Sequence, residues 1–357
     1  MPALPPGSTI GILGGGQLAR MLALAAARLG LKCHIFAPEH DSPAFHVSAA
    51  HIVAQYTDQN ALIEFAAEVD AITYEFENVP VEAVAFLEKL NPVRPGSKAL
   101  RVTQDRIKEK SLARELGALT AEFRSVTSLA ELTQAVKDIS LPAVLKTTRL
   151  GYDGKGQAKI MEPAQIESAW AAMKSQPAIL ESFINFQKEI SVICVRGADR
   201  HFAAYEPVEN IHCHHILHTS TVPAAIDQAL AIEAVFVAQR LAEALDYLGV
   251  MGVEFFVAAD VLYVNEIAPR VHNSGHWTMD ACVVSQFEQH IRAVAGWPLG
   301  STYRHSDVVM TNLLGDESSN WEVLAAQPDV GLHLYGKRES RAGRKMGHFN
   351  KIRPRQA

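Results

Sequence analysis

Residues 264–278 (VNEIAPRVHNSGHWT) concentrate side chains whose types could do chemistry on anions. The segment holds a carboxylate, a guanidinium, two imidazoles and an amide, at Glu266, Arg270, His272, His276 and Asn273. Carboxylates are ligands for hard divalent cations, and the planar fork of an arginine matches the shape of carbonate or phosphate. These residue types at this spacing predict a site that holds a metal ion beside one or more anions.

A second acidic residue, Glu254, belongs to the same predicted site. Residues 251–257 and 261–267 are predicted to form a hairpin whose turn is centred on Asp260. Position 254 then faces position 266, and the two carboxylates repel each other unless a cation lies between them. Mg²⁺ carrying nucleotide phosphates is the natural candidate, with Mn²⁺ as a substitute. The alternative is a slipped register in which one glutamate points to solvent, but the arginine and histidines that follow favour the site.

The bulk composition is that of an ordinary globular protein of two or three domains. The chain has 357 residues, 48% of them hydrophobic, and its 33 basic and 39 acidic residues give a net charge of −6. This charge provides no overall basic field, so nucleic acid is not an expected partner. The four cysteines form no C-x-x-C pair, and we find neither a signal peptide nor a membrane span. A cytoplasmic protein with small-molecule substrates is expected.

The N-terminal residues predict a β-α-β unit with parallel strands. Residues 9–13 form a short apolar run, a triple-glycine turn follows, a helix runs to Gly30, and residues 32–37 form the second strand. This order places a glycine turn at the N-terminus of the helix, where anions bind readily.

The glycine turn also fits a dinucleotide-binding pattern. Gly14, Gly16 and Ala19 match G-x-G-x-x-A, and Glu39 lies near the end of the second strand. A single glycine pattern is weak support for a dinucleotide. We favour a helix N-terminus that holds some other anion, with Gln17 as a possible hydrogen-bond donor to it.

The next predicted strand, residues 71–77, ends in two carboxylates. Ligands bind at the carboxyl ends of parallel strands, so Glu75 is a candidate ligand contact; a solvated strand end is the alternative. An amphipathic helix is predicted over 81–90, and residues 91–97 are rich in Pro, Gly and Ser. We place the first domain boundary there, which gives an N-terminal domain of residues 1–97.

A glycine-rich loop follows a strand at 141–148 that carries Lys146. The loop, residues 149–157 (RLGYDGKGQ), has three glycines and one lysine, so its backbone N–H groups can fold over phosphates. It lacks the G-K-[ST] of a Walker loop, and a plain hairpin turn is the alternative. A buried strand at 179–184, with Glu189 after it, could hold adenine and a ribose hydroxyl.

Histidines crowd residues 211–218 (IHCHHILH). On a single strand His212 and His214 would share one face and His215 would lie on the other. A zinc site is one interpretation. No other Cys or His cluster supplies ligands at motif spacing, so we favour structural or solvated histidines, one of them lining a nucleotide site.

The C-terminal part combines helices, short strands and a basic run. Further helices are predicted at 99–116, 225–248 and 286–294, a second boundary at 296–300, and strands at 308–314 and 331–335. Five lysines and arginines then fall between residues 337 and 345. In a chain of net charge −6 this concentration indicates an anionic partner, and phosphate is the natural one. A solvated basic tail is the alternative.

Seven stretches together resemble the ATP-grasp superfamily, and within it the 5-(carboxyamino)imidazole ribonucleotide synthases of purine biosynthesis. They are GGGQLARM (14–21), KTTRLGYDGKGQ (146–157), ESFINFQKEIS (181–191), MGVEFF (251–256), NEIAPRVHNSGHWT (265–278), VSQFEQH (284–290) and GRKMGH (343–348). The resemblance runs from the first strand to the C-terminus. GYDGKGQ and APRVHNSGHWT together are highly specific to it.

The resemblance implies an ATP-grasp fold of the α/β and α+β class, with ATP between two antiparallel sheets. A Rossmann-like parallel sheet would form residues 1–97. The ATP-grasp domain would span 98–296, with the glycine-rich loop 149–157 closing over the phosphates. A small, mostly β domain with the basic substrate-phosphate segment would form residues 297–357. Relatives are commonly homodimers, so a homodimer is expected.

The resemblance also implies a role for each candidate residue. The expected ATP contacts are Arg106, Lys146, Gly151, Tyr152, Asp153, Gly154, Lys155, Gly156, Gln157, Glu181, Ser182, Phe183, Ile184, Glu189, His212, Asn265 and Glu266. The expected contacts of the ribonucleotide substrate are Gln17, Glu75, Tyr152, Lys155, Lys337, Arg344 and Lys345. The expected metal ligands are Glu254 and Glu266, and the expected catalytic residues are Arg270, His272, Asn273, Lys146 and Asp153.

Two details of the metal site differ from a regular pattern. Many relatives carry an asparagine two residues after the second glutamate, where this chain has Ala268. Phosphates and water are therefore expected to complete the metal's ligands. Asn265, which precedes Glu266, would point to the other face of a regular strand.

The implied reaction is the ATP-dependent carboxylation of 5-aminoimidazole ribonucleotide by bicarbonate. ATP would phosphorylate bicarbonate to carboxyphosphate, and the exocyclic amine of the ribonucleotide would capture the carboxyl group, with ADP and phosphate released. The alternatives are another ATP-grasp ligase, a nicotinamide-dependent dehydrogenase and a non-catalytic nucleotide-binding regulator. Ala268 and HNSGHW argue against the other ligases, and the set of Lys146, Glu254, Glu266 and Arg270 argues against a regulator.

Overall fold

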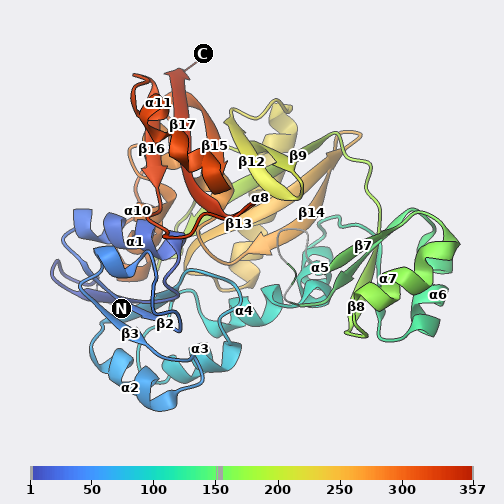
Figure 1. Cartoon of the computed structure of the whole chain (residues 1–357), viewed down its shortest axis with the longest axis horizontal. Coiled ribbons are helices and arrows are strands. Elements are labelled where there is room, and N and C mark those ends of the chain that lie inside the picture. Colours follow the sequence, from blue (N-terminus) through green and yellow to red (C-terminus); the bar gives the residue numbers. More distant parts are fainter. Residues whose placement is uncertain (1–2, 150, 152–155, 356–357) are drawn as a thin grey trace.

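The computed structural model describes residues 3–149, 151 and 156–355. The N-terminal part is a parallel four-stranded sheet in the order β3-β2-β1-β4 (Figure 1). Its strands are β1 (Thr9–Leu13), β2 (Lys32–Ala37), β3 (Ala50–Val53) and β4 (Ala71–Tyr74), and its helices are α1 (Gln17–Arg28), α2 (Gln59–Ala67) and α3 (Val81–Leu87). Ile10 and Ile12 share a core with α1, whereas Leu13 and Ile72 share another with α2 and α3. The helices therefore cover both faces, as a buried parallel sheet requires.

The central element is a nine-stranded sheet in the order β14-β13-β9-β11-β12-β15-β17-β16, with β10 also paired to β9. Its strands are β9 (Lys188–Arg196), β10 (Phe202–Ala204), β11 (Val208–Cys213), β12 (Ile216–Val222), β13 (Gly249–Ala258), β14 (Val261–Ala268), β15 (Ser306–Leu314), β16 (Val330–Leu334) and β17 (Lys345–Pro354). Helices α8 (Gln228–Ala244) and α10 (Gln286–Ala295) cover opposite faces. Val192 and Cys194 pack with α8, whereas Ile193 and Val195, which alternate with them, pack with α10.

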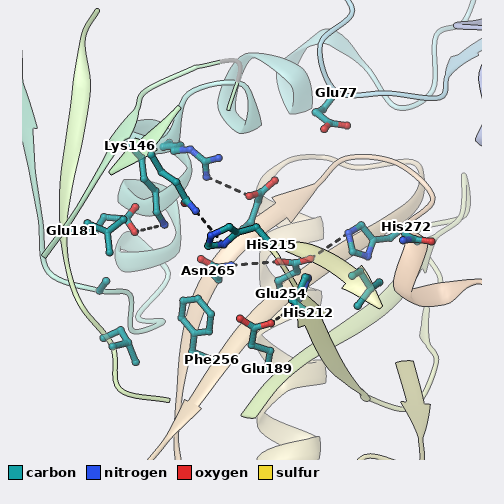
Figure 2. Close-up of a pocket in the computed structure, with 18 of the residues that line it drawn as sticks. Glu77, Lys146, Glu181, Glu189, His212, His215, Glu254, Phe256, Asn265 and His272 are labelled. Carbon is teal, nitrogen blue, oxygen red and sulfur yellow. Dashed lines mark hydrogen bonds and ion pairs between the residues drawn. The ribbon is translucent and has the colours of Figure 1, made fainter. Parts of the chain in front are cut away.

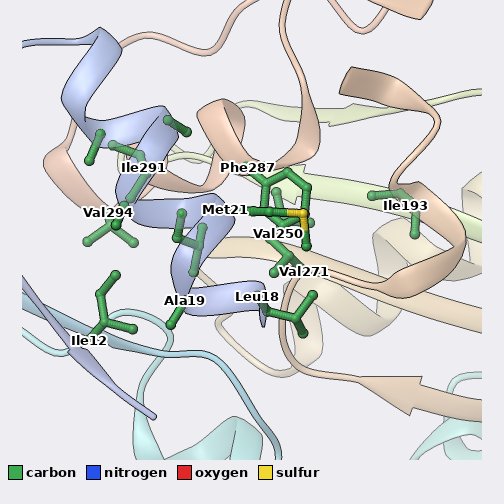
Figure 3. Packing of buried hydrophobic residues seen from close by; sticks show 14 of the residues in the cluster. Ile12, Leu18, Ala19, Met21, Ile193, Val250, Val271, Phe287, Ile291 and Val294 are labelled. Carbon is green, nitrogen blue, oxygen red and sulfur yellow. The ribbon is translucent and has the colours of Figure 1, made fainter. Parts of the chain in front are cut away.

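Helices α1 and α10 join the parallel sheet to the nine-stranded sheet. Figure 3 shows Leu18 and Met21 of α1 beside Phe287 of α10 and Val250 of β13. These residues are buried in one core that also contains Ile12 of β1. This packing holds the glycine turn before α1 close to the large sheet.

A small four-stranded sheet in the order β5-β8-β6-β7 faces the large one. Its elements are β5 (Phe123–Val126), β6 (Ala143–Thr147), β7 (Gln157–Ile160), β8 (Ala178–Ser182), α6 (Leu129–Ile139) and α7 (Ile166–Ala172). Leu145 and Leu180 pack with α6 and α7 in a separate core. Val144 and Lys146 alternate with Leu145 and point to the other face, which lines a cleft.

The remaining helices are α4 (Ser97–Thr103), α5 (Arg106–Glu115), α9 (Thr278–Ala281) and α11 (Trp321–Ala325). The expectation of one helix over 99–116 is wrong, because the chain breaks between α4 and α5. Asp105 caps α5: its Oδ1 accepts hydrogen bonds from the N–H groups of Ile107 at 3.1 Å and Lys108 at 3.4 Å. An N-cap residue has extended backbone, so it ends the preceding helix.

The expectation of a single strand over 211–218 is also wrong. His214 and His215 have φ of 51° and 66° and form the turn between β11 and β12. Two consecutive left-handed residues are the mark of a tight hairpin turn. His212 and His214 therefore do not share a strand face.

The basic run leads into β17, a strand that was not predicted from the sequence. β17 pairs with β15 on one side and with β16 on the other. The C-terminal strands thus extend the central sheet. None of the helices in the described part of the chain is long and apolar enough to cross a lipid bilayer.

Candidate active site

A cleft of about 1090 Å³ lies between the small sheet and the large sheet. The edge of the parallel sheet and Lys345 also line it. Figure 2 shows Lys146 and Glu181 on one side, facing Glu254 and His272 on the other. Such a concave site with convergent charged groups is the default place for catalysis.

Most of the predicted site residues meet in this cleft. It is lined by Gln17, Glu75, Arg106, Lys146, Gln157, Glu181, Ser182, Phe183, Ile184, Glu189, His212, Asn265, Glu254, Glu266, Arg270, His272, Asn273 and Lys345. Gly151, Gly156, Lys337 and Arg344 do not line it, although the Gly151 carbonyl accepts a bond from Arg106 Nη2 at 3.2 Å. Tyr152, Asp153, Gly154 and Lys155 lie outside the described residues.

The hairpin of β13 and β14 brings Glu254 opposite Glu266, as predicted. The turn itself differs from the prediction: Ala259 and Asp260, both with positive φ, form a two-residue turn rather than one centred on Asp260. That turn alone would set Glu254 opposite residue 265. A β-bulge between Glu254 and Phe255 shifts the pairing by one residue, so the two glutamates face each other.

The bulge also changes the direction of Asn265. The expectation that Asn265 points to the other face from Glu266 is wrong, because both residues line the cleft. Asn265 Nδ2 donates to Glu254 Oε2 at 3.3 Å. A bulge interrupts the alternation of side chains along a strand, and this allows consecutive residues to share a face.

The carboxylate pair is electrostatically strained. Burial, together with the charge of Glu266, raises the pKa of Glu254 to about 7. Arg106 Nη1 lies 3.3 Å from Glu266 Oε2, and His272 Nε2 lies 3.4 Å from Glu254 Oε1. Burial, followed by the charge of Arg270, lowers the pKa of His272 well below its usual value, so its imidazole is neutral. The negative charge of the two carboxylates is therefore not fully balanced by neighbouring positive groups, and their oxygen atoms fit a hard divalent cation.

Arg270 is held by an acidic residue from the parallel-sheet edge. Its Nε pairs with Glu77, and its Nη1 donates to the Val271 carbonyl at 3.1 Å. Burial alone would lower the pKa of Arg270, but the charge of Glu77 outweighs it and raises that pKa. Gln104 donates to the carbonyls of Glu77 and Val79 at 2.8 and 2.7 Å, and this fixes the loop that carries Glu77.

The segment after Arg270 is fixed by a buried amide. Gln286 accepts from the His272 N–H at 2.9 Å and donates to the His272 carbonyl at 2.7 Å. Asn273 follows, and neither of its side-chain polar atoms has a hydrogen-bond partner among the described residues. A buried amide without partners in a cleft is suited to bind a polar ligand.

On the small-sheet side, Glu181 lies between two lysines. Lys146 Nζ is 2.7 Å from Glu181 Oε2, and Lys110 Nζ is 3.4 Å from Oε1. Burial alone would raise the pKa of Glu181, but the ammonium groups of Lys110 and Lys146 lower it to about 2. At the far end of the cleft His212 pairs with Glu189.

The anion at the N-terminus of α1 is Glu75 itself. Its carboxylate accepts hydrogen bonds from the N–H groups of Gly16 at 2.6 Å and Ala19 at 3.0 Å. A side chain at Gly14 or Gly16 would collide with Glu75. The glycine pattern therefore serves an internal carboxylate, and the pyrophosphate of a dinucleotide would have to displace it. The expectation that this turn holds a ligand anion is corrected accordingly.

The basic run lies beside the cleft, next to the parallel sheet. Arg338 Nε is 3.2 Å from Asp41 Oδ2, and Lys337 Nζ donates to the Lys345 carbonyl at 2.7 Å. Burial, together with the charge of Arg344, lowers the pKa of Lys337 to about 8. The run thus gathers positive charge where the parallel and large sheets meet.

Four residues of the site have contacts that were not predicted from the sequence: Glu77, Gln286, Glu109 and Lys110. Glu77 carried the same strand-end signal as Glu75, which could have identified it. Glu109 and Lys110 share a helix face with Arg106 by their spacing of three and four residues. No sequence signal singled out Gln286.

Three family models together match most of the chain. The ribonucleotide synthetase preATP-grasp domain matches residues 8–104, the ATP-grasp domain matches 111–287, and the phosphoribosylaminoimidazole carboxylase C-terminal domain matches 308–357. These matches confirm the expected fold class, an ATP-grasp fold that follows a parallel sheet.

Relatives and solved structures match over almost the full length. The N5-carboxyaminoimidazole ribonucleotide synthase of Brucella melitensis is 51% identical, with 99% of this chain and 98% of that protein covered. The crystal structure of an ADP complex of an N5-carboxyaminoimidazole ribonucleotide synthetase has a TM-score of 0.95 at 43% identity, covering 99% of this chain and 94% of that one. The Aspergillus clavatus synthase in complex with ADP and 5-aminoimidazole ribonucleotide has a TM-score of 0.92 at 30% identity, covering 98% and 94%.

Proposed function

The chain belongs to the N5-carboxyaminoimidazole ribonucleotide synthase family, and we propose that it catalyses the ATP-dependent carboxylation of 5-aminoimidazole ribonucleotide. Bicarbonate supplies the carboxyl group through carboxyphosphate, and ADP and phosphate are released, as a step of purine biosynthesis. The observation that carries the proposal is the cleft in which the Glu254–Glu266 pair faces Lys146 and lies beside Arg270. Carboxylate, ammonium and guanidinium groups around one cavity suit the transfer of a phosphoryl group between anions.

The proposed ATP site lies between the two sheets. Residues 181–184 line one end, where the base would sit, and Glu189 would bind the ribose. Lys146 and Arg106 would bind the phosphates, helped by the glycine-rich loop. The aromatic ring of Phe256 also lines the cleft and offers an apolar surface for the base.

Glu254 and Glu266 would hold Mg²⁺, or Mn²⁺ in its place. Among the described residues no group of three or more His, Cys, Asp or Glu side chains is arranged as a metal site, so phosphate oxygens and water would complete the ligands. A metal ion held there would neutralise phosphate charge. Arg106, already paired with Glu266, would keep that carboxylate aimed at the cleft.

Arg270, His272 and Asn273 would bind bicarbonate and then carboxyphosphate. The planar fork of Arg270 matches an anion with two oxygens in one plane. The Asn273 amide has hydrogen-bonding groups to offer, and the neutral imidazole of His272 adds no charge that would compete with Arg270. Because both reactants are anions, charge neutralisation and alignment account for most of the expected rate gain.

The ribonucleotide would lie with its phosphate on Lys337, Arg344 and Lys345. Gln17 and Glu75, at the edge of the parallel sheet, would contact the same substrate. Tyr152 and Asp153 would contact the imidazole ring and its exocyclic amine. The amine attacks the carboxyl carbon of carboxyphosphate, a C–N bond forms, phosphate leaves with the electrons of the broken C–O bond, and the proton lost by the amine passes to the released phosphate.

Phosphate release with and without each substrate tests the proposal. We expect phosphate release from ATP to require Mg²⁺ and bicarbonate, and to rise on addition of 5-aminoimidazole ribonucleotide with incorporation of label from ¹⁴C-bicarbonate into the product. Formate in place of bicarbonate serves as the control. Phosphate release with formate, or release without incorporation of label, would point to a different ligase.

A further inference from the structure

Helix α5 buries two charged residues that the proposed reaction does not use. Glu109 and Lys110 are each only 1% exposed. Lysine and glutamate are almost never buried to this degree unless their charges are engaged. With Arg106 they form one face of α5, because residues three and four apart lie on the same side of a helix.

These residues bind the backbone of β14 on both sides of Glu266. In the described part of the chain β14 is the edge of the large sheet and pairs only with β13. The carbonyl of Leu119 accepts from the outer N–H of Val264 at 2.8 Å, and side chains of α5 bind the outer groups around Glu266. Glu109 Oε1 accepts from the Ile267 N–H at 2.6 Å, and Lys110 Nζ donates to the Asn265 carbonyl at 3.2 Å.

Lys110 also reaches the small sheet. Its Nζ lies 3.4 Å from Glu181 Oε1, and Lys146 binds the other oxygen of that carboxylate. One ammonium group therefore touches β8 of the small sheet and β14 of the large one. Each of these two strands carries a glutamate that lines the proposed ATP site, Glu181 on β8 and Glu266 on β14.

We propose that Glu109 and Lys110 are positioning residues that set the depth of Glu266 in the cleft and its distance from Glu181. The inference rests on the proposed function, since it takes Glu266 as a metal ligand. An edge strand can shift or fray, and the bonds at residues 265 and 267 hold the backbone on both sides of Glu266, so that its side chain is presented at a fixed place. Loss of either bond should weaken metal-dependent nucleotide binding before it affects binding of the nucleotide alone.

The test measures ADP affinity by titration calorimetry with and without Mg²⁺. We expect Mg²⁺ to tighten ADP binding by the wild-type protein. Lys110→Met and Glu109→Leu should each reduce this Mg²⁺-dependent increase in affinity by about tenfold. A tenfold change in affinity corresponds to the free energy of one buried hydrogen bond. For Glu109→Leu the affinity without Mg²⁺ should change by less than about threefold, because Glu109 would act through β14 and Glu266. Glu109→Gln keeps an acceptor for the Ile267 N–H and should behave as wild type.

Two further variants separate the possible failures. Lys108→Met alters an exposed residue of the same helix and should leave both affinities unchanged. Glu266→Gln should abolish most of the Mg²⁺ gain. If Glu266→Gln keeps the gain, the proposed metal site is wrong. If Glu266→Gln loses the Mg²⁺-dependent increase in affinity while Lys110→Met and Glu109→Leu keep it within about twofold, the positioning role is overturned. If one of these two variants does not fold, the result for the other decides.

Discussion

Arg270 pairs with Glu77 through its Nε in the structure. An arginine paired in this way is oriented before substrate binds, and its planar group is not free to rotate. The bicarbonate or carboxyphosphate would add a second anion to the same fork. Arg270 should therefore matter for the charge that develops in the transition state rather than for binding of ATP.

Arg270→Ala is expected to lower kcat by about 100-fold or more, because it removes charge stabilisation of the transition state. The Kd for ADP should stay within about threefold of the wild-type value, since Arg270 lies among the bicarbonate residues and not among the proposed phosphate contacts. Steady-state phosphate release and calorimetry measure the two quantities. Unchanged turnover would remove Arg270 from the mechanism.

Deprotonation of Lys337 should weaken binding of the ribonucleotide at alkaline pH and so set an alkaline limit to the reaction. Burial and the charge of Arg344 lower its pKa to about 8, so its ammonium group loses the proton as the pH rises through 8. The KM for the ribonucleotide should then rise above pH 8, while the KM for ATP stays flat. Lys337→Arg, which stays charged, should shift this limit to higher pH.

Lys337→Ala serves as the companion variant. It should raise the KM for the ribonucleotide more than the KM for ATP at pH 7, because the lost charge faces the ribonucleotide phosphate in the proposal. The reverse result would mean that the basic run serves the nucleotide. An alkaline limit that persists unchanged in Lys337→Arg would mean that another group titrates there.

The residue types predicted the chemistry of the cleft, but they did not predict every side chain that pairs with the cleft residues. Glu254, Glu266 and Lys146 stand out because charged residues within apolar strands call for an explanation. Lys110 does not stand out, because a charge on a polar helix is usually solvated; only the approach of β8 and β14 to α5 buries it. Glu75 lines the cleft as expected, but its bonds to the N-terminus of α1 were not predicted, because they depend on how the helix packs against the sheet edge.

At the scale of elements, the predicted pairing of Glu254 with Glu266 in the β13–β14 hairpin is correct, but for a reason that the sequence does not reveal. A two-residue turn and a bulge each displace the register by one residue relative to the prediction, and the two displacements cancel at Glu254 and Glu266. Periodicity can predict which strands pair, because alternation is a property of the strand. Periodicity cannot locate a bulge, because the position of a bulge depends on what the extra residue contacts. Here the extra residue is Asn265, which contacts Glu254 and Lys110.

The turn of this hairpin is a place where stability can be gained. Ala259 and Asp260 have φ of 49° and 60°, a region in which an alanine costs about 1 kcal/mol. The double change Ala259→Asn with Asp260→Gly should raise the free energy of unfolding by about 1 kcal/mol, because Asn-Gly favours this turn type. The shift of the urea midpoint measures it, and kcat should stay unchanged because neither residue lines the cleft.

Changing Val261 in the same hairpin to Thr provides a control outside the turn. It keeps a β-branched residue in an ordinary strand position, so the stabilisation seen for the turn variant should be absent. If the turn variant is no more stable than the wild type, the left-handed turn is not the conformation of these residues.

At the scale of the whole molecule, the cleft is assembled from parts that are far apart in the sequence. The small sheet, the large sheet, the edge of the parallel sheet and Lys345 all contribute residues. Hydrophobic patterning predicts each sheet because burial is a local property of a strand. It does not predict that the basic run ends in an inner strand of the central sheet, since a run of charges resembles a solvated tail.

Asn350 is the residue that ties this inner strand to the active-site segment. It lies in β17, opposite Met310 of β15 and Gly331 of β16, and it is fully buried. Its Nδ2 donates to Asp280 Oδ2 at 2.7 Å and to the carbonyl of His276 at 3.1 Å. The C-terminal strand is therefore bonded directly to residues that follow His272 and Asn273.

Asn350→Ala should lower the free energy of unfolding by about 1–3 kcal/mol, because it leaves the buried carbonyl of His276 and the partly buried carboxylate of Asp280 each without this donor. Thermal and urea unfolding measure the loss. Arg353→Ala, an exposed position on the same strand, is the matched control and should change stability by no more than about 0.5 kcal/mol. Equal effects of the two changes would show that β17 behaves as a solvated tail, and the C-terminal strand would then not help to hold the active-site segment in place.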